Sequence, residues 1–346
     1  MRRGRVTIAE VAERAGVSLT TVSHVLSARR PVAPGTRQRV LEIIDELGYE
    51  PDSAAAGLAG ARSTTIALDA FGGTSWALSQ LVEPESYFYI GLLRAIEAHA
   101  TAAGYDLLMP SRPQDDAGGY LRRLRSRRAA GVVVMARNFD DPRTRALLEA
   151  QFPTVFVDMF GRGPKATSVT SDNADGARQA TEHLLALGHR RIARISKAAD
   201  PMAGQGRNTG ARAALSAAGV LEDPRLVLEA EWTPDAAYQA TVRLLRSGAP
   251  FTAVLAGSDV MAINVIAALA DHGLRVPEDV SVVGFDDLQL GTMVRPTLTT
   301  VRQDTDAMGA AVIEALRRIL DGEPAPEPIL VPTALVVRGS TAAPRP

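Results

Sequence analysis

Residues 6–26 read VTIAEVAERAGVSLTTVSHVL, and this stretch decides the fold of the first part of the chain. Thr7 and Glu10 form a T-x-x-E capping box, the pattern that begins a helix. Apolar residues follow at the spacing of one helix face, namely Ile8, Val11, Ala12 and Ala15. Gly16 interrupts this helix and Ser18 caps a second one. The stretch therefore predicts two short helices joined by a turn, a helix-turn-helix.

A third helix is predicted directly after this pair. Pro34 stands at its first position, where proline is favoured, and Gly48 stands at its end. Its apolar stripe consists of Val40, Ile43, Ile44 and Leu47. Residues 1–52 are therefore expected to form an all-α head.

The head is strongly basic although the whole chain is nearly neutral. Residues 1–40 carry eight arginines against Glu10 and Glu13, a local charge of +6. Since the net charge of the chain is -1, the other 306 residues carry -7. The arginines stand at positions 2, 3, 5, 14, 29, 30, 37 and 39. This asymmetry indicates a small nucleic-acid-binding module joined to an acidic body.

Length and composition exclude several other classes of protein. The chain has 346 residues, which predicts more than one domain, and 46% of them are hydrophobic, which excludes general disorder. It has no cysteine, which excludes disulfides, thiolate metal sites and a cysteine nucleophile and fits a reducing compartment. No apolar run approaches the length of a membrane span, and no apolar stretch follows the basic N-terminus. We therefore expect a cytoplasmic protein that does not contact a membrane.

From residue 64 onward, strand and helix patterns alternate, which predicts parallel sheets with helical crossovers. Strands are expected at 64–70, 105–109, 131–136, 153–158, 167–172, 190–196, 225–229, 251–256, 280–285 and 329–338. Helices are expected at 89–103, 116–128, 142–151, 174–187, 208–218, 235–247, 259–272 and 304–321. So many units fit two similar lobes better than one open sheet. The tail STAAPRP (340–346) is expected to be frayed.

Several long motifs resemble one known family. Besides residues 6–26 they are VAPGTRQRVLEIIDELGYEPD (32–52), AAGLAG (55–60), SDNADGARQATEHLLALGHRRIA (171–193), VPEDVSVVGFDD (276–287) and RPTLTTVRQ (295–303). The chain resembles the lactose-repressor (LacI/GalR) family of bacterial regulators over residues 6–340. The resemblance implies an all-α helix-turn-helix head and an α/β, type I periplasmic-binding-protein-like effector domain with two lobes and parallel sheets.

The resemblance also implies where the domains divide. The head covers residues 1–52, a hinge helix or linker 53–62, and the effector-binding and dimerisation domain 63–340. The first lobe is expected at 63–163 and 297–324, and the second at 164–296 and 325–340. As in the family, the chain is expected to be a homodimeric transcriptional regulator. A repressor of carbohydrate-utilisation genes that responds to a sugar-like effector is the leading hypothesis.

Three residues match the positions at which the family reads base edges: Leu19, Thr20 and His24. His24 stands where the family usually has arginine, so the operator half-site is expected to differ from the family consensus. Candidate contacts to the DNA backbone are Thr7, Ser18, Thr21, Ser23, Arg30 and Thr36. Ala33 replaces the usual capping serine before the third helix, which weakens that helix. The partner is expected to be a pseudo-palindromic double-stranded operator.

The small-residue segment at 53–61 has two interpretations. On composition alone it is a flexible linker. In the family it forms a hinge helix on DNA, and the resemblance places Ala55 and Leu58 in the minor groove, Leu58 as an apolar wedge. Gly57 and Gly60 each oppose helix formation by about 1 kcal/mol, so we expect this hinge to be only weakly biased toward helix.

The resemblance implies an effector site between the lobes. The matching positions are Phe88, Tyr89, Asp172, Arg207, Trp232, Ser258 and Asp286. Arg207 and Asp286 would hold vicinal hydroxyls and Trp232 would cover a sugar ring. Asp172 has the alternative role of a helix cap, and Trp232 that of a core residue. Gln205 is a rival to Arg207, because residues 203–207 can be aligned with the family's motif in two ways that differ by two residues. Ser258 stands where Asn or Asp is usual.

Two rival functions remain open on the sequence. One is a ligand-binding or transport receptor with a vestigial head. The lack of a secretory-signal pattern at the N-terminus argues against it. The other is a nucleotide-dependent oxidoreductase, supported only by the glycines of GQGRNTG (204–210), whose last spacing is wrong for a dinucleotide fingerprint. No catalytic or metal-binding pattern is present, so no enzyme activity, cofactor or metal is predicted. Residues 76–85 look like an insertion of undetermined role.

Overall fold

The computed structural model describes residues 6–27, 30–49, 63–70, 84–109, 116–135 and 141–345 of the chain. The chain divides between Thr64 and Thr65 into two compact units, which we call the head and the body. Each unit has hydrophobic clusters of its own. Within the described ranges, no helix is both long and apolar enough to cross a membrane.

The described part of the head is a bundle of three helices. They are α1 (Ile8–Ala15), α2 (Leu19–Ser27) and α3 (Pro34–Leu47). The predicted capping box is present, because the Glu10 amide donates to the Thr7 hydroxyl and the Glu10 carboxylate accepts from the Thr7 amide. Val11, Val22 and Val40 come one from each helix and are fully buried. Their contact holds the helix-turn-helix pair against α3.

The helix ends of the head follow the sequence expectations. Gly16 and Gly48 have φ values of 64° and 60°, a left-handed conformation that glycine adopts without strain at a helix end. The hydroxyl of Ser18 accepts from the Thr21 amide at 3.1 Å at the start of α2. Ala33 precedes α3 and makes no side-chain cap hydrogen bond. The cap that a serine would provide is therefore missing, and the weakening of α3 stays a prediction.

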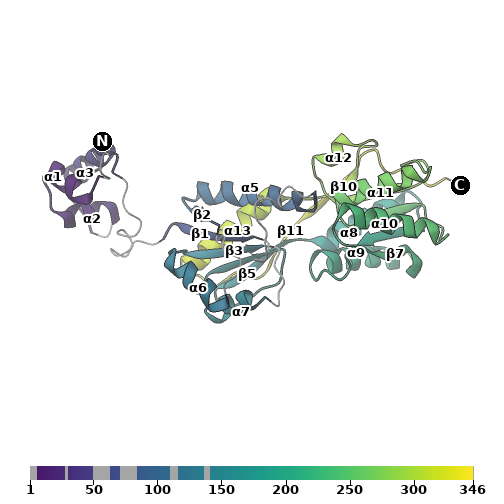
Figure 1. Ribbon diagram of the computed structural model, residues 1–346, viewed down its shortest axis with the longest axis horizontal. Helices are drawn as coiled ribbons and strands as arrows, with labels where there is room; N and C mark the ends of the chain where they lie inside the picture. Colours follow the sequence, from purple (N-terminus) through teal and green to yellow (C-terminus); the bar gives the residue numbers. More distant parts are fainter. Residues whose placement is uncertain are drawn as a thin grey trace. The chain divides into compact units, whose positions relative to one another are not determined.

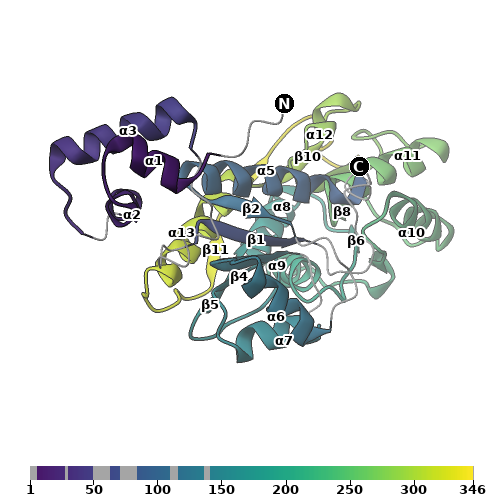
Figure 2. The ribbon, with the colours of Figure 1, turned by 60° about the vertical axis from the view of Figure 1, so that its left-hand side comes forward.

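The first lobe of the body is built on a parallel sheet with the strand order β11-β5-β4-β3-β1-β2. The strands are β1 (Thr65–Ala70), β2 (Asp106–Leu108), β3 (Gly131–Met135), β4 (Thr154–Val157), β5 (Ala166–Ser171) and β11 (Ile329–Val331). A short 3-10 helix, η3 (Pro84–Ser86), leads into α5 (Tyr87–Ala102). Helices α5 and α13 (Thr305–Leu320) cover one face, and α6 (Ala117–Ser126) and α7 (Pro142–Glu149) cover the other (Figure 1, Figure 2).

The second lobe repeats this plan with the strand order β12-β10-β9-β8-β6-β7. The strands are β6 (Ile192–Ser196), β7 (Val227–Glu229), β8 (Ala253–Ala256), β9 (Ser281–Asp286), β10 (Thr299–Gln303) and β12 (Thr333–Val336). Helices α8 (Asn173–Ala186) and α9 (Ala203–Ala217) cover one face, and α10 (Pro234–Arg246) and α11 (Asp259–Asp271) the other. The short helices are η4 (Pro224–Leu226) and α12 (Leu290–Met293). Only β12 runs antiparallel to its neighbour, β10. The expected two-lobed α/β class is confirmed.

The chain crosses between the lobes later than expected at all three points. The first crossing follows β5, although we expected it before residue 164. The second follows β10 and the third follows β11, although we expected them before residues 297 and 325. Each of these strands completes the sheet of the lobe that the chain is about to leave. The single strand expected at 329–338 is wrong for the same reason, because β11 belongs to the first sheet and β12 to the second.

The crossings fix the relation of the two sheets within the body. Strands β5 and β11 run parallel to their neighbours in the first sheet, and β10 runs parallel to β9 in the second. Each therefore leaves its sheet at the carboxyl edge. Since the connections between the lobes are short, the carboxyl edges of both sheets meet at the crossings, which is where ligands bind in open α/β sheets.

The C-terminal tail is packed rather than frayed, as far as residue 345. The Thr299 amide donates to the hydroxyl of Ser340 at 2.8 Å, and this hydroxyl donates to the carbonyl of Val282 at 2.6 Å. The amide of Ala342 donates to Ser281 at 3.0 Å. These hydrogen bonds attach the segment after β12 to β9 and β10, and Arg345 pairs with Asp279 at 2.6 Å, so the expectation of a frayed tail was wrong.

Helix α9 begins at Ala203, five residues before the expected start at 208. Its glycines, which oppose helix formation in isolation, allow close packing here. A Cβ added at Gly204 would lie 1.9 Å from the carbonyl oxygen of Lys197, and one at Gly210 would lie 1.9 Å from that of Ala174. The motif GQGRNTG thus lies inside a helix that packs against α8. Its glycines leave room for this close packing, so they need no nucleotide-binding role.

Candidate functional site

The predicted base-reading residues lie on helix α2 of the head. Leu19 is 51% exposed, and Thr20 is exposed beside it. His24 follows one turn later and is half-buried. A helix with such a surface fits the major groove, where a leucine can contact a thymine methyl group. Their roles in base reading stay predictions.

The predicted backbone-contacting residues of the head differ in exposure. Thr7, Ser18 and Arg30 are exposed, and Thr21, Ser23 and Thr36 are half-buried. The hydroxyls of Ser18 and Thr21 lie 2.9 Å apart and share a hydrogen bond. The guanidinium of Arg14 is paired with Glu46 at 2.7 Å, so this arginine is engaged within the head. The hinge residues Ala55 and Leu58, arginines 2, 3, 5 and 29, and residues 76–83 of the expected insertion lie outside the described residues.

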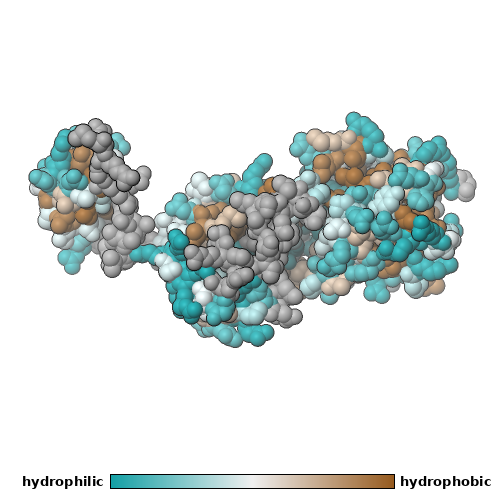
Figure 3. Space-filling view, in the orientation of Figure 1, coloured by the Kyte–Doolittle hydropathy of each residue, from teal (hydrophilic) through white to brown (hydrophobic). Residues whose placement is uncertain are grey.

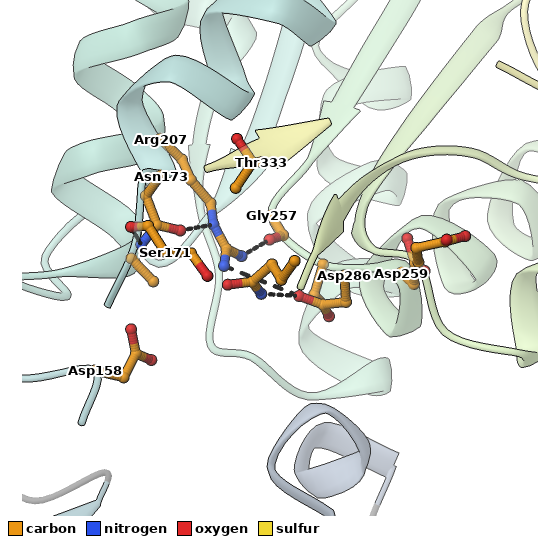
Figure 4. Close-up of polar contacts among 12 residues, drawn as sticks. Asp158, Ser171, Asn173, Arg207, Gly257, Asp259, Asp286 and Thr333 are labelled. Atoms are coloured by element: carbon orange, nitrogen blue, oxygen red, sulfur yellow. Dashed lines mark hydrogen bonds and ion pairs between the residues drawn. The ribbon is translucent and has the colours of Figure 1, made fainter. Parts of the chain in front are cut away.

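In the body, Arg207 of α9 is the centre of a buried polar cluster (Figure 4). Its Nε donates to Oδ1 of Asn173 at 2.9 Å, and its Nη1 donates to the carbonyl of Gly257. Its Nη2 lies 3.9 Å from Oδ1 of Asp286. The guanidinium carbon lies 3.7 Å from the centre of the Phe285 ring. These contacts hold a cation in place at the carboxyl edge of the second sheet.

Asp286 is the last residue of β9 and has a φ of 127°, an uncommon backbone conformation for a residue other than glycine. Its Oδ1 accepts from Nε2 of Gln303 at 2.7 Å. Burial raises the pKa of the Asp286 carboxyl to about 6, and the positive charge of Arg207 opposes this rise. Asp286 is therefore ionised at neutral pH but close to protonation.

The turn after β9 is anchored by two further carboxylates. Asp259, the first residue of α11, is fully buried and accepts from the amide of Leu288 at 2.7 Å and from the hydroxyl of Thr300. Burial raises the pKa of Asp259 well above its usual range, and the neighbouring charge of Asp286 adds to the rise. Asp287, with a φ of 60°, pairs with Nε of Arg302 at 2.7 Å. These bonds hold the turn that presents Asp286.

The first lobe contributes a second polar pair. The hydroxyl of Tyr89 donates to Oδ2 of Asp158 at 2.9 Å, and the hydroxyl of Thr170 donates to Oδ1 at 3.2 Å. Burial raises the pKa values of both Tyr89 and Asp158. The charge of Arg207 opposes the rise at Asp158, so the two lobes interact electrostatically here.

The structure brings together four of the seven predicted effector residues. Tyr89 lies with Asp158 on one side, and Arg207, Trp232 and Asp286 lie on the other, with Trp232 at 5.4 Å from the Arg207 guanidinium carbon. Gln205, the rival of Arg207, is exposed on the outer side of α9. The structure thus favours Arg207.

The other three predicted residues have structural roles. Asp172 accepts from the Asp175 amide at 2.9 Å and so caps α8, the alternative noted for it above. Ser258 accepts from the Met261 amide at 3.2 Å and caps α11. Phe88 is only 8% exposed and belongs to the core of the first lobe. Helix caps can still face a ligand, and Phe88 also borders the groove beside Asp286.

Sequence reasoning missed Asp158, Asn173 and Gln303. Asp158 directly follows the buried strand β4, and ligands of open α/β sheets bind at such strand ends, so its place in the sequence could have pointed to it. Gln303 is the last residue of β10, a strand that the sequence pattern did not predict. Asn173 carries no such signal, because only the packing of α8 on α9 places its amide beside Arg207.

A groove of about 660 Å³ opens beside Asp286 and Gln303. Helix α5 forms its other wall, through residues that include Phe88, Gly91 and Arg94. Among the described residues, no group of three His, Asp or Glu side chains is arranged to hold a metal ion. Asp286 and Gln303 line this groove, whereas Arg207 and Trp232 are not among its lining residues. The polar cluster around Arg207 offers hydrogen-bonding groups, an aromatic ring and a buried arginine, which suit a polar organic ligand.

Comparison with known proteins agrees with this architecture. Residues 7–52 match the family described as "Bacterial regulatory proteins, lacI family", and residues 181–341 match a "Periplasmic binding protein-like domain". The chain is 35% identical to the HTH-type transcriptional regulator CelR of Thermobifida fusca over 98% of its own length and 99% of the relative's.

Two solved structures are similar over nearly the whole chain. A complex of the transcriptional regulator CelR with cellobiose has a TM-score of 0.72 at 34% identity and covers 97% of this chain and 100% of that one. A lac repressor dimer bound to operator and the anti-inducer ONPF has a TM-score of 0.80 at 28% identity and covers 98% and 99%. With its helix-turn-helix head and periplasmic-binding-protein-like body, this chain belongs to the lacI family of bacterial transcriptional regulators.

Proposed function

We propose that this regulator represses genes of carbohydrate use and that a neutral sugar, bound between the two lobes, changes its affinity for the operator. The observation that carries the proposal is the placement of Arg207, Asp286 and Trp232 together at the carboxyl edge of the second sheet. A carboxylate and a guanidinium hold vicinal hydroxyls, and an aromatic ring covers the apolar face of a sugar.

The charge of the cleft favours a neutral ligand over a phosphorylated one. Asp158, Asp200 and Asp286 act electrostatically on one another or on shared neighbours, and the cation of Arg207 opposes them. Two of the guanidinium nitrogens of Arg207 already donate to Asn173 and Gly257. A phosphate group would meet an excess of negative charge there.

The head reads the operator with one face of α2. Leu19, Thr20 and His24 contact base edges, and Thr7, Ser18, Thr21, Ser23, Arg30 and Thr36 contact the DNA backbone. Ala55 and Leu58 insert into the minor groove at the operator centre. Support comes from the exposure of Leu19 and from the resemblance of the lac repressor dimer, which was solved on its operator. The protein acts as a homodimer on a pseudo-palindromic site in the cytoplasm.

Ligand screening tests the effector class. Thermal-shift measurements on the full chain would compare neutral mono- and disaccharides, polyols, sugar phosphates and nucleobases, with cellobiose included because a relative binds it. We expect a neutral saccharide to raise the unfolding midpoint, since a ligand that binds only the folded state stabilises it. Stabilisation by sugar phosphates or nucleobases alone would contradict the proposal.

A further inference from the structure

Helix α6 and the turn after it carry a concentration of positive charge. Five arginines stand within seven residues, at positions 122, 123, 125, 127 and 128. The nearest acidic residues along the chain are Asp116 before them and Asp140 after them. We call these five residues the α6 arginine cluster. It contrasts with the rest of the chain after residue 40, whose net charge is negative.

The cluster occupies an outer surface. Helix α6 buries Tyr120 and Leu124 against the sheet, which leaves Arg125 and Arg127 exposed. Figure 3 shows a strongly hydrophilic surface where α6 lies in Figure 1. Arg122 is 76% exposed and lies 3.9 Å from Asp116 at the start of the helix.

Two arginines of the cluster, Arg125 and Arg127, differ in their pairing from several other arginines of the same lobe. Arg317 and Arg318 of α13 and Arg162 each have a carboxylate partner within 2.8 Å. Within the part of the chain that the structure describes, no ion pair with a carboxylate involves Arg125 or Arg127. No carboxylate of the described residues therefore neutralises these two charges, which are available to an anionic partner.

The cluster lies near the residue at which the body joins the segment that leads to the DNA-binding head. Strands β1 and β3 are parallel and begin at the same edge of the sheet, where the Ala130 amide donates to the carbonyl of Thr65 at 2.8 Å. Thr65 begins the body, directly after the segment that leads to the head. Arg127 precedes Ala130 by three residues, so their Cα atoms lie within about 11 Å of each other. The cluster thus lies beside the point at which the body is tethered to the DNA-binding head.

We propose that the α6 arginine cluster contacts the phosphates of duplex DNA that flanks the sequence read by the head. The proposal rests on the function proposed above. Arginine pairs with phosphate, and the tether holds this surface at high effective concentration near the bound duplex. Long exposed side chains at this edge do not read bases, so the contact adds affinity and salt dependence but no sequence specificity.

Fluorescence anisotropy on two DNA lengths tests the proposal. A 20-bp duplex selected from a random library for binding to the full chain would be used alone and at the centre of a 60-bp duplex. Arg125→Gln/Arg127→Gln would be compared with the control Arg212→Gln/Arg246→Gln, which removes two exposed helical arginines of the second lobe. Unfolding midpoints would establish that both variants fold.

We expect the Arg125→Gln/Arg127→Gln variant to bind the 60-bp duplex about 3–10-fold more weakly near 0.1 M salt. The slope of log affinity against log salt should fall by about 2 per protomer, because each lost phosphate contact contributes about 0.9. The 20-bp duplex should bind unchanged, and the control should match the wild type on both. Equal losses on both lengths, or no loss on the long one, would overturn the inference. A wild type that does not prefer the selected sequence would instead refute the proposed function.

Discussion

The guanidinium of Arg207 lies against the ring of Phe285 at 3.7 Å and reaches to within 3.9 Å of the carboxylate of Asp286, the next residue. One end of strand β9 therefore supplies both the apolar surface and the charge that orient this arginine. Asn173 of α8 fixes it from the other side. These contacts limit the freedom of the Arg207 side chain, which lowers the cost of ordering it when a ligand binds.

Replacing Arg207 tests its role in effector binding. Arg207→Lys keeps the charge but removes the planar group that stacks on Phe285 and bonds to Asn173 and Gly257. We expect sugar affinity to fall at least about tenfold in titration calorimetry, the loss of roughly one or two hydrogen bonds to a charged group. Gln205→Ala serves as the control, since Gln205 is exposed, and should bind within about twofold of the wild type. A larger loss for Gln205→Ala would reverse the assignment.

Asp286 should make stability depend on pH in a defined direction. Burial raises its pKa from 3.8 to about 6, so the folded protein holds this proton more tightly than the unfolded chain. The stability that Asp286 contributes is therefore present at low pH and lost as the pH rises through about 6. Asp286→Asn has no charge to bury, and we expect it to be more stable than the wild type at pH 8 by about 1–3 kcal/mol.

Denaturant unfolding across pH 5–8 measures this difference. It should shrink below about pH 6, where the wild type is also neutral. Effector affinity should change in the opposite sense, weakening in the variant at every pH and in the wild type below about pH 6. A stability difference that is the same at pH 5 and pH 8 would show that the charge of Asp286 is not buried.

The contact between α8 and α9 predicts a sensitive glycine. A Cβ at Gly210 would lie 1.9 Å from the carbonyl oxygen of Ala174, so Gly210→Ala must push the two helices apart. We expect a loss of about 3 kcal/mol or more in the free energy of unfolding. Gly91→Ala, also within a helix, would meet Thr305 only at 3.8 Å and should be neutral or slightly stabilising. Similar effects for both variants would contradict the close approach.

His24 should determine part of the operator sequence. His24→Arg restores a side chain that can form two hydrogen bonds with guanine, worth about 1–3 kcal/mol of base discrimination. Selection from a random DNA library should therefore add a guanine preference at one position of each half-site. Arg30→Gln is the control and should weaken binding without changing the selected sequence, because phosphate contacts do not specify bases. An unchanged consensus for His24→Arg would remove His24 from the base-reading set.

Local signals in the sequence predicted the head and most of the helices and strands. The capping box of Thr7 and Glu10 and the glycine at position 16 define α1 without help from the rest of the chain. Alternation of strands and helices likewise predicted two parallel lobes. These features depend on neighbours in sequence, which is why they can be inferred from it.

The parts that sequence reasoning missed depend on contacts between distant segments. The crossings after β5, β10 and β11 follow from which sheet each strand completes, and no local pattern records that choice. The start of α9 was hidden because its glycines oppose helix formation unless α8 packs closely against them. Asn173 joins the site only through that same packing. Strand-end residues such as Asp158 were within reach of sequence reasoning, since they follow buried runs as Asp286 does.

Operator binding under effector control is the central claim, and anisotropy titration of the full chain measures it most directly. The duplex selected from a random library would be compared with a scrambled duplex of equal length, with and without the neutral sugar that most stabilises the protein. We expect the selected duplex to bind at least about a thousandfold more tightly than the scrambled one. Saturating sugar should change that affinity at least about fivefold. Equal affinity for both duplexes, or an operator affinity that the sugar leaves unchanged, would contradict the account.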